Sequence, residues 1–281
     1  MSSKPQWLHI RHSDSPNREA VENLLSSLNL NTVCREAKCP NAFECFSRKT
    51  ATFMILGTNC TRNCPFCNVS NGEPSQIDKK ETENVAVAVK TLGLKYVVVT
   101  SVTRDDLPDG GSNHFAKLIS EVRKSAPETA IEVLIPDFLG SIDALKTVTD
   151  ATPDVIGHNV ETVKSLYTKV RPQASYKRSM SLLGNIKELN SSIRVKSGVM
   201  VGMGETKAQL YELFDDLLDV GCEFLTIGQY LAPSKKHYPV HEYVKPEIFE
   251  EYGAEARRRG FKFALSAPLV RSSYHADEAL S

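Results

Sequence analysis

The chain of 281 residues is long enough for one large domain or two small ones. Its hydrophobic share of 41% and charged share of 24% are ordinary for a globular protein, and its net charge of zero argues against a general nucleic-acid binder. No apolar run approaches the length of a membrane span, and the amino end lacks the apolar core of a signal peptide. Six of the seven cysteines fall between positions 34 and 67, unlike the cysteines of a secreted disulfide scaffold, so we expect a cytoplasmic protein.

Residues 1–50 are predicted to form a polar extension, with an amphipathic helix over Asn17 to Leu28. Cys34, Cys39 and Cys45 follow with the spacing C-x4-C-x5-C, and we call them the N-terminal triad. Three free thiols are one interpretation of this triad. A zinc site completed by a later cysteine is another, although it would leave the later cysteines without a full ligand set.

A second group, Cys60, Cys64 and Cys67, has the spacing C-x3-C-x2-C, and we call it the loop triad. It comes directly after an apolar segment, residues 52–57, that is predicted to be a strand. Three thiolates can hold a four-iron cluster while leaving one iron open to an outside ligand. A structural zinc site or part of a redox pair is the alternative, but no fourth cysteine or histidine lies at close spacing.

From residue 51 onward predicted strands and helices alternate, as in a parallel sheet with crossover helices. After the first strand, further strands are expected over residues 96–100, 130–134, 154–158, 194–201, 223–227 and 261–265. Helices are expected over residues 81–92, 113–125, 141–149, 176–189, 207–220 and 247–259.

The loop triad, with Phe66 before its last cysteine, resembles the signature of radical S-adenosylmethionine (radical SAM) enzymes. The two triads together with Arg271-Ser272-Ser273-Tyr274 resemble the lipoyl synthase family, over about residues 4–277. The resemblance implies an α/β fold, a partial (β/α)6 TIM-type barrel with N-terminal and C-terminal cluster-binding extensions. The expected divisions are residues 1–50, the barrel at 51–265, and a tail at 266–281. In such barrels the site lies at the carboxyl ends of the strands.

The resemblance also implies the chemistry. Two [4Fe-4S] clusters and SAM are the expected cofactors, with SAM bound to the open iron of the loop-triad cluster. Reductive cleavage of SAM gives a 5'-deoxyadenosyl radical, which removes hydrogen from unactivated carbons. Sulfur is inserted at carbon 6 and carbon 8 of an octanoyl chain on a carrier lysine, and the auxiliary cluster of the N-terminal triad is the sacrificial sulfur donor.

By the same resemblance Ser273 is the fourth ligand of the auxiliary cluster, with Ser272 as the other possibility. Phe66 is expected beside the SAM-binding cluster. Gly202 and Glu205 belong to a segment that lines the adenine side in the family, although a tight strand-to-helix turn explains its glycines equally well.

Four more predicted SAM contacts follow the second and fourth strands of the barrel. Thr100 and Ser101 stand where the family usually has a G-G-E-like segment, so their assignment rests on position alone. Asn159 and Glu161 correspond to residues that hold the ribose or amino acid part of SAM. Arg171 is a candidate for binding a carboxylate. Surface ion pairing is the alternative for the last three.

The partners that the resemblance implies are octanoylated lipoyl domains, namely those of 2-oxoacid dehydrogenase E2 subunits and the glycine cleavage H protein. A flavodoxin or ferredoxin reductant and an iron–sulfur carrier protein are also expected, with no nucleic acid or membrane partner and a monomeric state. The alternatives are another sulfur-inserting radical SAM enzyme and a non-catalytic iron–sulfur carrier, whose cluster would have full protein ligation and no affinity for SAM.

Overall fold

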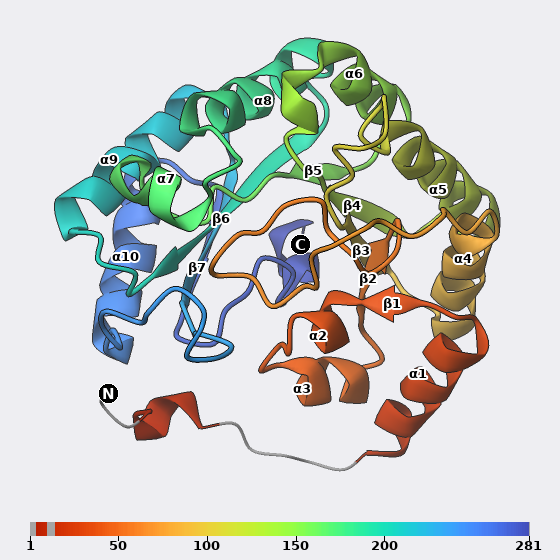
Figure 1. Cartoon of the computed structure of the whole chain (residues 1–281), viewed down its shortest axis with the longest axis horizontal. Coiled ribbons are helices and arrows are strands. Elements are labelled where there is room, and N and C mark those ends of the chain that lie inside the picture. Colours follow the sequence, from red (N-terminus) through yellow and green to blue (C-terminus); the bar gives the residue numbers. More distant parts are fainter. Residues whose placement is uncertain (1–3, 10–14, 281) are drawn as a thin grey trace.

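A single sheet, whose strands lie side by side in chain order, forms the centre of the molecule (Figure 1). The computed structural model describes residues 4–9 and 15–280. Residues 1–3 and 10–14 of the predicted extension and Ser281 of the predicted tail lie outside the described residues. Strands β2 to β8 are parallel, and β1 pairs antiparallel with β2. The strands are β1 (Asn31–Thr32), β2 (Thr52–Ile55), β3 (Tyr96–Ser101), β4 (Ala130–Leu134), β5 (Val155–Gly157), β6 (Arg194–Val201), β7 (Phe224–Gln229) and β8 (Phe263–Ser266).

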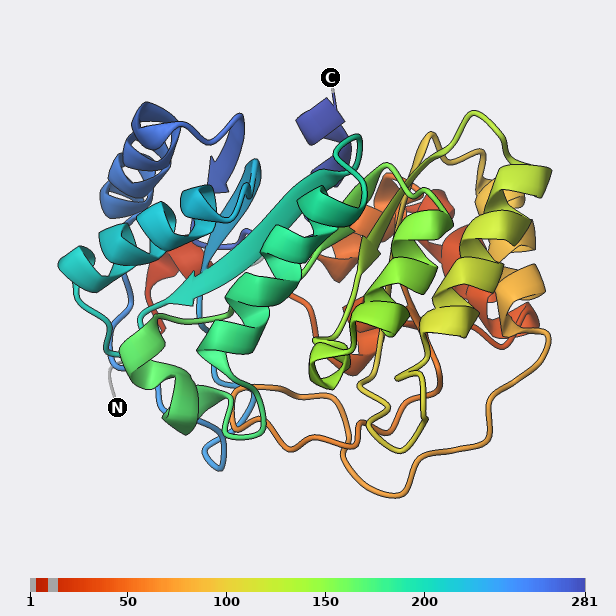
Figure 2. The same ribbon diagram turned by 90° about the horizontal axis from the view of Figure 1, so that it is seen from above.

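A long helix follows each strand from β2 to β7, and these helices form the outer arc of the barrel (Figures 1 and 2). They are α4 (Glu81–Leu92), α5 (Ser112–Ser125), α6 (Ile142–Asp150), α8 (Tyr176–Leu189), α9 (Lys207–Asp219) and α10 (Pro246–Arg259). Short turns η2 (Phe138–Gly140) and η3 (Lys164–Leu166) and helix α7 (Tyr167–Val170) lie in the connections. The predicted partial (β/α)6 barrel is confirmed, and β8 adds a seventh parallel strand. Among the described residues no strand joins β8 back to β1, so the sheet stays open.

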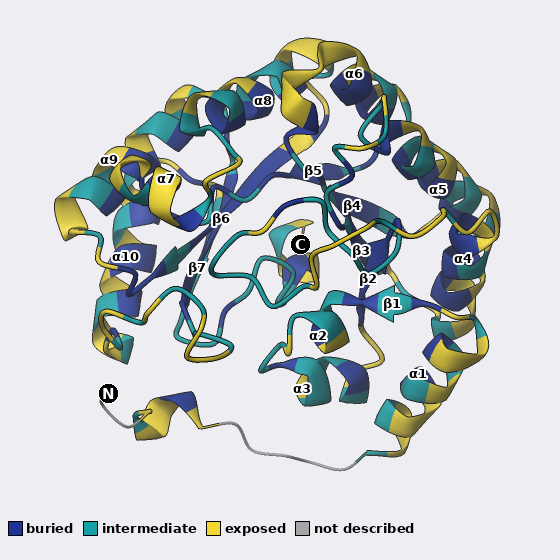
Figure 3. Cartoon of the chain, viewed as in Figure 1, coloured by how far each residue is buried: buried dark blue, intermediate teal, exposed yellow. Residues whose placement is uncertain are grey.

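The core lies between the sheet and the helical arc, where the facing surfaces are buried (Figure 3). Strand β7 is buried at all six positions, as expected for a strand covered on both faces. Helix α5 buries Phe115, Leu118, Ile119 and Val122, which recur at helical spacing along one face. Burial of these apolar stripes provides most of the stability that holds the helices against the sheet.

Helix ends follow the local chemistry of the sequence. Helix α4 ends at Gly93, whose φ of 64° is the left-handed conformation that glycine adopts without strain. Helix α9 begins with a capping box in which Thr206 and Gln209 each bond the other's backbone amide. Each of the six long helices begins and ends within one residue of its predicted bounds. Each of the predicted strands begins and ends within two residues of its predicted bounds.

The amino-terminal and carboxyl-terminal segments meet beside β2. Asn41 donates from its side-chain amide to the carbonyl of Leu269 at 2.7 Å, and η4 (Ala276–Leu280) contacts β3. The predicted N-terminal helix is confirmed as α1 (Pro16–Ser27). Short elements not predicted from the sequence are η1 (Gln6–Leu8), α2 (Val33–Glu36), α3 (Ala42–Ser47) and η4 (Ala276–Leu280). In the described part of the chain, no helix has the length and apolar character needed to cross a membrane.

Candidate active site

The loop triad lies in the connection after β2, at the carboxyl end of the barrel strands. The backbone N–H of Cys60 donates to the carbonyl of Ser70 at 2.8 Å, and the backbone N–H of Cys67 donates to the carbonyl of Cys64 at 3.0 Å. Burial is the largest cause that raises the pKa of Cys67, to about 12, and the charges of the other two thiols add to it. The raised pKa keeps the Cys67 thiol protonated, so it is no free thiolate nucleophile; a bound metal, whose positive charge displaces the proton, would make it a ligand.

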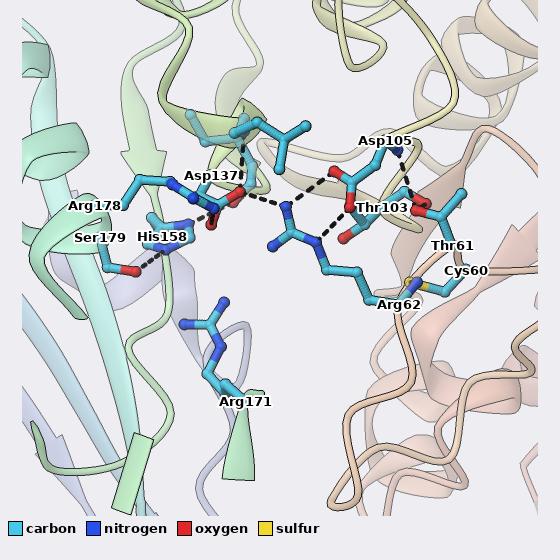
Figure 4. A network of polar contacts seen from close by, with 12 residues as sticks. Cys60, Thr61, Arg62, Thr103, Asp105, Asp137, His158, Arg171, Arg178 and Ser179 are labelled. Atoms are coloured by element: carbon cyan, nitrogen blue, oxygen red, sulfur yellow. Dashed lines mark hydrogen bonds and ion pairs between the residues drawn. The ribbon is translucent and has the colours of Figure 1, made fainter. Parts of the chain in front are cut away.

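Arg62, within the loop triad, anchors this connection to the barrel (Figure 4). Its guanidinium makes two bonds to Asp105, at 2.7 and 2.9 Å, and a third to the fully buried Asp137 at 2.6 Å. Asp137 also accepts from Arg178 at 3.2 Å. Although burial acts in the opposite direction, the bonds from Arg62 lower the pKa of Asp137 to about 2. The side chain between the cysteines is thus fixed by carboxylates that follow β3 and β4.

The N-terminal triad gathers from α2, the loop after it, and α3. The three thiols are close enough for Cys34 and Cys39 to raise the pKa of Cys45 through their charges. Burial is the larger cause and brings the pKa of Cys45 to about 12, and that of Cys34 to about 11. The three thiols of the N-terminal triad are therefore neutral without a metal, and they lie beside the start of β2.

Ser273 lies next to the N-terminal triad. Thr52, the first residue of β2, donates from its hydroxyl to Ser273 Oγ at 2.7 Å. Tyr274 bonds the carboxylate of Glu44 in α3 at 3.0 Å, so the tail is also held by the extension. Gly228 in β7 makes room for the tail, because a Cβ there would be only 2.0 Å from the carbonyl oxygen of Val270.

Both triads border one cavity of ≈ 550 Å³, which we call the main cavity. Five of the six triad cysteines line it, together with eight of the other predicted site residues: Cys34, Cys39, Cys60, Cys64, Cys67, Phe66, Thr100, Ser101, Asn159, Glu161, Arg171, Ser272 and Ser273. Cys45 lines a smaller cavity of ≈ 260 Å³, the side cavity, which shares Thr52 and Ser273 with the main cavity. The two triads thus lie on the walls of one chamber.

The main cavity is lined by charged groups of both signs, Glu161 and Arg171. Glu161 has a φ of 66°, unusual for a residue other than glycine, and its backbone bridges to Val199 of β6. Burial raises the pKa of Glu161, while the neighbouring Arg171 opposes that rise. Arg171 bonds the carbonyl of Asn159 at 2.7 Å, but its Nε, like the hydroxyl of Ser101, is buried and has no protein partner in the described structure. Such groups fit the charged amino acid end of SAM.

Gly202 and Glu205 do not line either of these cavities. The carboxylate of Glu205 accepts the backbone amides of Gly202 and Met203, at 2.6 and 2.9 Å. It therefore stabilises the turn that follows β6, which agrees with the turn interpretation of this segment. Their predicted contact with SAM stays a prediction.

Functional candidates that the sequence did not single out are Thr52, Arg62, Asp105 and Asp137. The sequence shows Arg62 within the loop triad and the acidic pair Asp105-Asp106 after β3, but no sequence pattern indicates that they interact. Among the described residues, 4–9 and 15–280, no three His, Cys, Asp or Glu side chains lie close enough together to bind a single metal ion. Thiolates of a four-iron cluster bind separate irons, so a cluster site does not require that spacing.

An open barrel with three cysteines in the loop after its first parallel strand defines a radical SAM enzyme. Residues 54–217 match the family model of the radical SAM superfamily. SuiB of Streptococcus suis, solved bound to S-adenosylmethionine, has a TM-score of 0.61 at 12% identity, covering 80% of this chain and 54% of its own. The hydrogenase maturase HydG also has a TM-score of 0.61 at 14% identity, covering 90% of this chain and 63% of its own. At these identities both structures support the fold alone.

The sequence relatives are more specific. Lipoyl synthase of Alkaliphilus metalliredigens is 56% identical over 277 residues, which is 99% of this chain and 96% of the relative. Lipoyl synthase of Caldicellulosiruptor saccharolyticus is 56% identical over 99% of this chain and 97% of the relative, and that of Geotalea uraniireducens is 50% identical over 99% and 98%. The chain belongs to the lipoyl synthase family.

Proposed function

We propose that this chain converts a protein-bound octanoyl-lysine into lipoyl-lysine by inserting two sulfur atoms, at carbon 6 and carbon 8 of the acyl chain. The observation that carries the proposal is the main cavity, which cysteines of both triads line. A methylene of the octanoyl chain has no acidic proton, so acid–base catalysis has nothing to act on. The acyl chain has to lie between a source of radicals and a source of sulfur, and the main cavity separates the two triads in this way.

In this proposal Cys60, Cys64 and Cys67 hold one [4Fe-4S] cluster, and the N-terminal triad with Ser273 holds the auxiliary cluster. When bound, the clusters and SAM supply the electron, the radical and the sulfur, as in other cofactor enzymes in which the protein positions and shields the reacting groups. The donor sets fit this role because two separate sets of three thiols need outside ligands to complete them.

The chain's own side chains bind and orient SAM. The buried Nε of Arg171, without a partner in the described part of the chain, is free to donate and would hold the carboxylate of SAM, and Glu161 would accept from its amino group. Ser101, Thr100 and Asn159, which line the same cavity, would hold the remaining polar groups. Phe66, which packs against the buried group formed by Val170, Met203 and Tyr230, would shield the cluster from water. Glu205 acts indirectly, by holding the turn after β6 in place.

The division of the chain follows from these roles. Residues 1–50 and 266–281 form the auxiliary-cluster site, and residues 51–265 form the radical SAM barrel. The substrates are octanoylated lipoyl domains of 2-oxoacid dehydrogenase E2 subunits and the glycine cleavage H protein. A flavodoxin or ferredoxin supplies electrons, an iron–sulfur carrier rebuilds the auxiliary cluster, and the enzyme works as a cytoplasmic monomer.

Mass spectrometry of an octanoyl-lysine peptide, after anaerobic incubation with SAM and a reductant, tests the function. The expected product carries two added sulfurs in place of two hydrogens. A peptide that stays unchanged while SAM binds and is cleaved would contradict the sulfur-insertion proposal. Electron paramagnetic resonance (EPR) of the reduced protein, titrated with SAM, separates this function from that of an iron–sulfur carrier, whose fully ligated cluster would show no change.

A further inference from the structure

Thr52 lies against two members of the proposed auxiliary-cluster site at once. Its hydroxyl donates to Ser273 Oγ at 2.7 Å. Cys34 lies close enough to Thr52 for this residue to influence the pKa of its thiol. Thr52 also lines the main cavity and the side cavity, as Ser273 does. Its hydroxyl group therefore stands between a thiol and a serine that are predicted to bind the same cluster.

The position of this hydroxyl is fixed by the barrel. Thr52 is the first residue of β2, pairs with Val98 of β3, and is only 8% exposed. A β-branched residue in a buried strand has few accessible side-chain rotamers. Ser273, in contrast, belongs to a tail segment without regular structure before η4. The rigid partner of the hydrogen bond is thus Thr52, and the serine is the partner that needs positioning.

The rest of the tail has separate anchors. Leu269 is held through Asn41 at 2.7 Å, and Tyr274 is held through Glu44 at 3.0 Å. Removing the Thr52 hydroxyl would leave these contacts in place. Its loss would release the Ser273 side chain without releasing the backbone that carries it.

Building on the proposed function, we propose that Thr52 is a positioning residue, whose hydroxyl holds Ser273 Oγ toward the auxiliary cluster. When a serine oxygen binds iron, its proton leaves to solvent as the cluster assembles, and the oxygen becomes an acceptor only. The Thr52 hydroxyl, already the donor of this pair, keeps that role in the loaded site. The hydrogen bond thereby sets how firmly the single oxygen ligand holds its iron.

The test uses the full chain loaded with both clusters and the near-isosteric substitution Thr52→Val. The rate of iron transfer to the chelator bathophenanthroline disulfonate is measured under anaerobic conditions, and Mössbauer spectra report the oxygen-bound iron. We expect Thr52→Val to release auxiliary-cluster iron about fivefold faster, the factor that one ordinary hydrogen bond is worth. Thr52→Ser keeps the hydroxyl and should stay near the parent rate. Thr129→Val is the matched control, because it removes another buried hydroxyl, one that donates at 2.7 Å to Leu94.

Ser273→Ala and the double variant separate this inference from the assignment on which it rests. If Thr52 acts through Ser273, Thr52→Val adds nothing in the Ser273→Ala background. A parental rate and spectrum for Thr52→Val, or an effect that adds to that of Ser273→Ala, would overturn the role of Thr52 alone. A parental spectrum for Ser273→Ala would instead overturn the serine ligand itself.

Discussion

The six cysteines of the two triads are alike in chemistry but are assigned to different steps. On the proposed assignment, the loop triad carries the cluster that cleaves SAM, and the N-terminal triad carries the cluster that gives up sulfur. Each triad supplies three thiols, so the loss of one leaves a cluster with only two cysteine ligands. At the scale of single residues, the two steps can therefore be separated by substitution.

Cys34→Ala should abolish lipoyl formation while SAM cleavage continues, because only the sulfur donor is lost. Cys64→Ala should abolish both, because the radical source is lost. The measurements are the 5'-deoxyadenosine formed and the mass of the octanoyl peptide. Lipoyl product from the Cys34 variant with added sulfide alone would contradict the sacrificial role of the auxiliary cluster. Cys222, which is buried away from both triads, provides a control as Cys222→Ala.

Asp105→Asn should weaken SAM binding. Asp105 holds Arg62, which lies within the loop triad, through two hydrogen bonds between charged groups. A hydrogen bond to a charged group is worth about 1.5–3 kcal/mol, which corresponds to at least a tenfold change if the loop loses its position. Asp106→Asn is the matched control, since Asp106 lies next along the chain but pairs with Arg104 instead. SAM titration followed by EPR gives both affinities. Equal affinities for the two variants would show that the Arg62 contact does not position the cluster.

At the scale of elements, the main feature is how the tail lies along β7. Gly228→Ala should displace the tail, because the added Cβ would lie 2.0 Å from the carbonyl oxygen of Val270. We expect faster loss of auxiliary-cluster iron and faster proteolysis after β8, with the loop-triad cluster unchanged. Gly184→Ala in α8 is the control, because its added Cβ would make only ordinary contacts with Val220. A Gly228 variant as resistant to protease as the Gly184 variant would contradict this packing.

The elements also show what sequence patterns can predict. The long helices were predictable because apolar periodicity and end signals agree, as at Pro246 and Gly260 around α10. Strand β1 and helices α2 and α3 were missed, because elements of two to six residues carry no measurable period. Cysteine spacing predicted which thiols belong together. The bonds of Arg62 to Asp137 and of Thr52 to Ser273 join residues 75 and 221 positions apart, so only the folded chain brings them together.

At the scale of the whole molecule, stability should depend on pH through a histidine in the barrel. The buried His158 donates from Nδ1 to the carbonyl of Ile135 and accepts at Nε2 from the hydroxyl of Ser179, each at 2.9 Å (Figure 4). Burial is the main cause that lowers its pKa from 6.5 to about 4. As the pH falls, the histidine is therefore protonated in the unfolded chain before it is protonated in the folded one. Its neutral form contributes fully to the free energy of unfolding above about pH 6.5. This contribution is lost between about pH 6.5 and pH 4 and does not change further below that.

The shift corresponds to roughly 3 kcal/mol between the ends of that range. His158→Gln should lose this part of the pH dependence, because glutamine has no proton to gain in the range. Urea unfolding at pH 7, 5.5 and 4.5 measures the effect, and His9→Gln at an exposed position is the control. A His158 variant whose unfolding midpoint falls as steeply as that of the parent would contradict this assignment.

The hydrogen bond between Thr52 and Ser273 also shows when the auxiliary centre can be completed during synthesis. The N-terminal triad leaves the ribosome before most of the barrel, whereas Ser273 follows Thr52 by 221 positions. On the proposed ligand set, a nascent chain exposes three thiols that lack their oxygen partner until nearly all of the polypeptide has been made. The full ligand set of this centre therefore exists only in chains whose translation has passed the tail, and prematurely terminated copies keep three thiols without the oxygen.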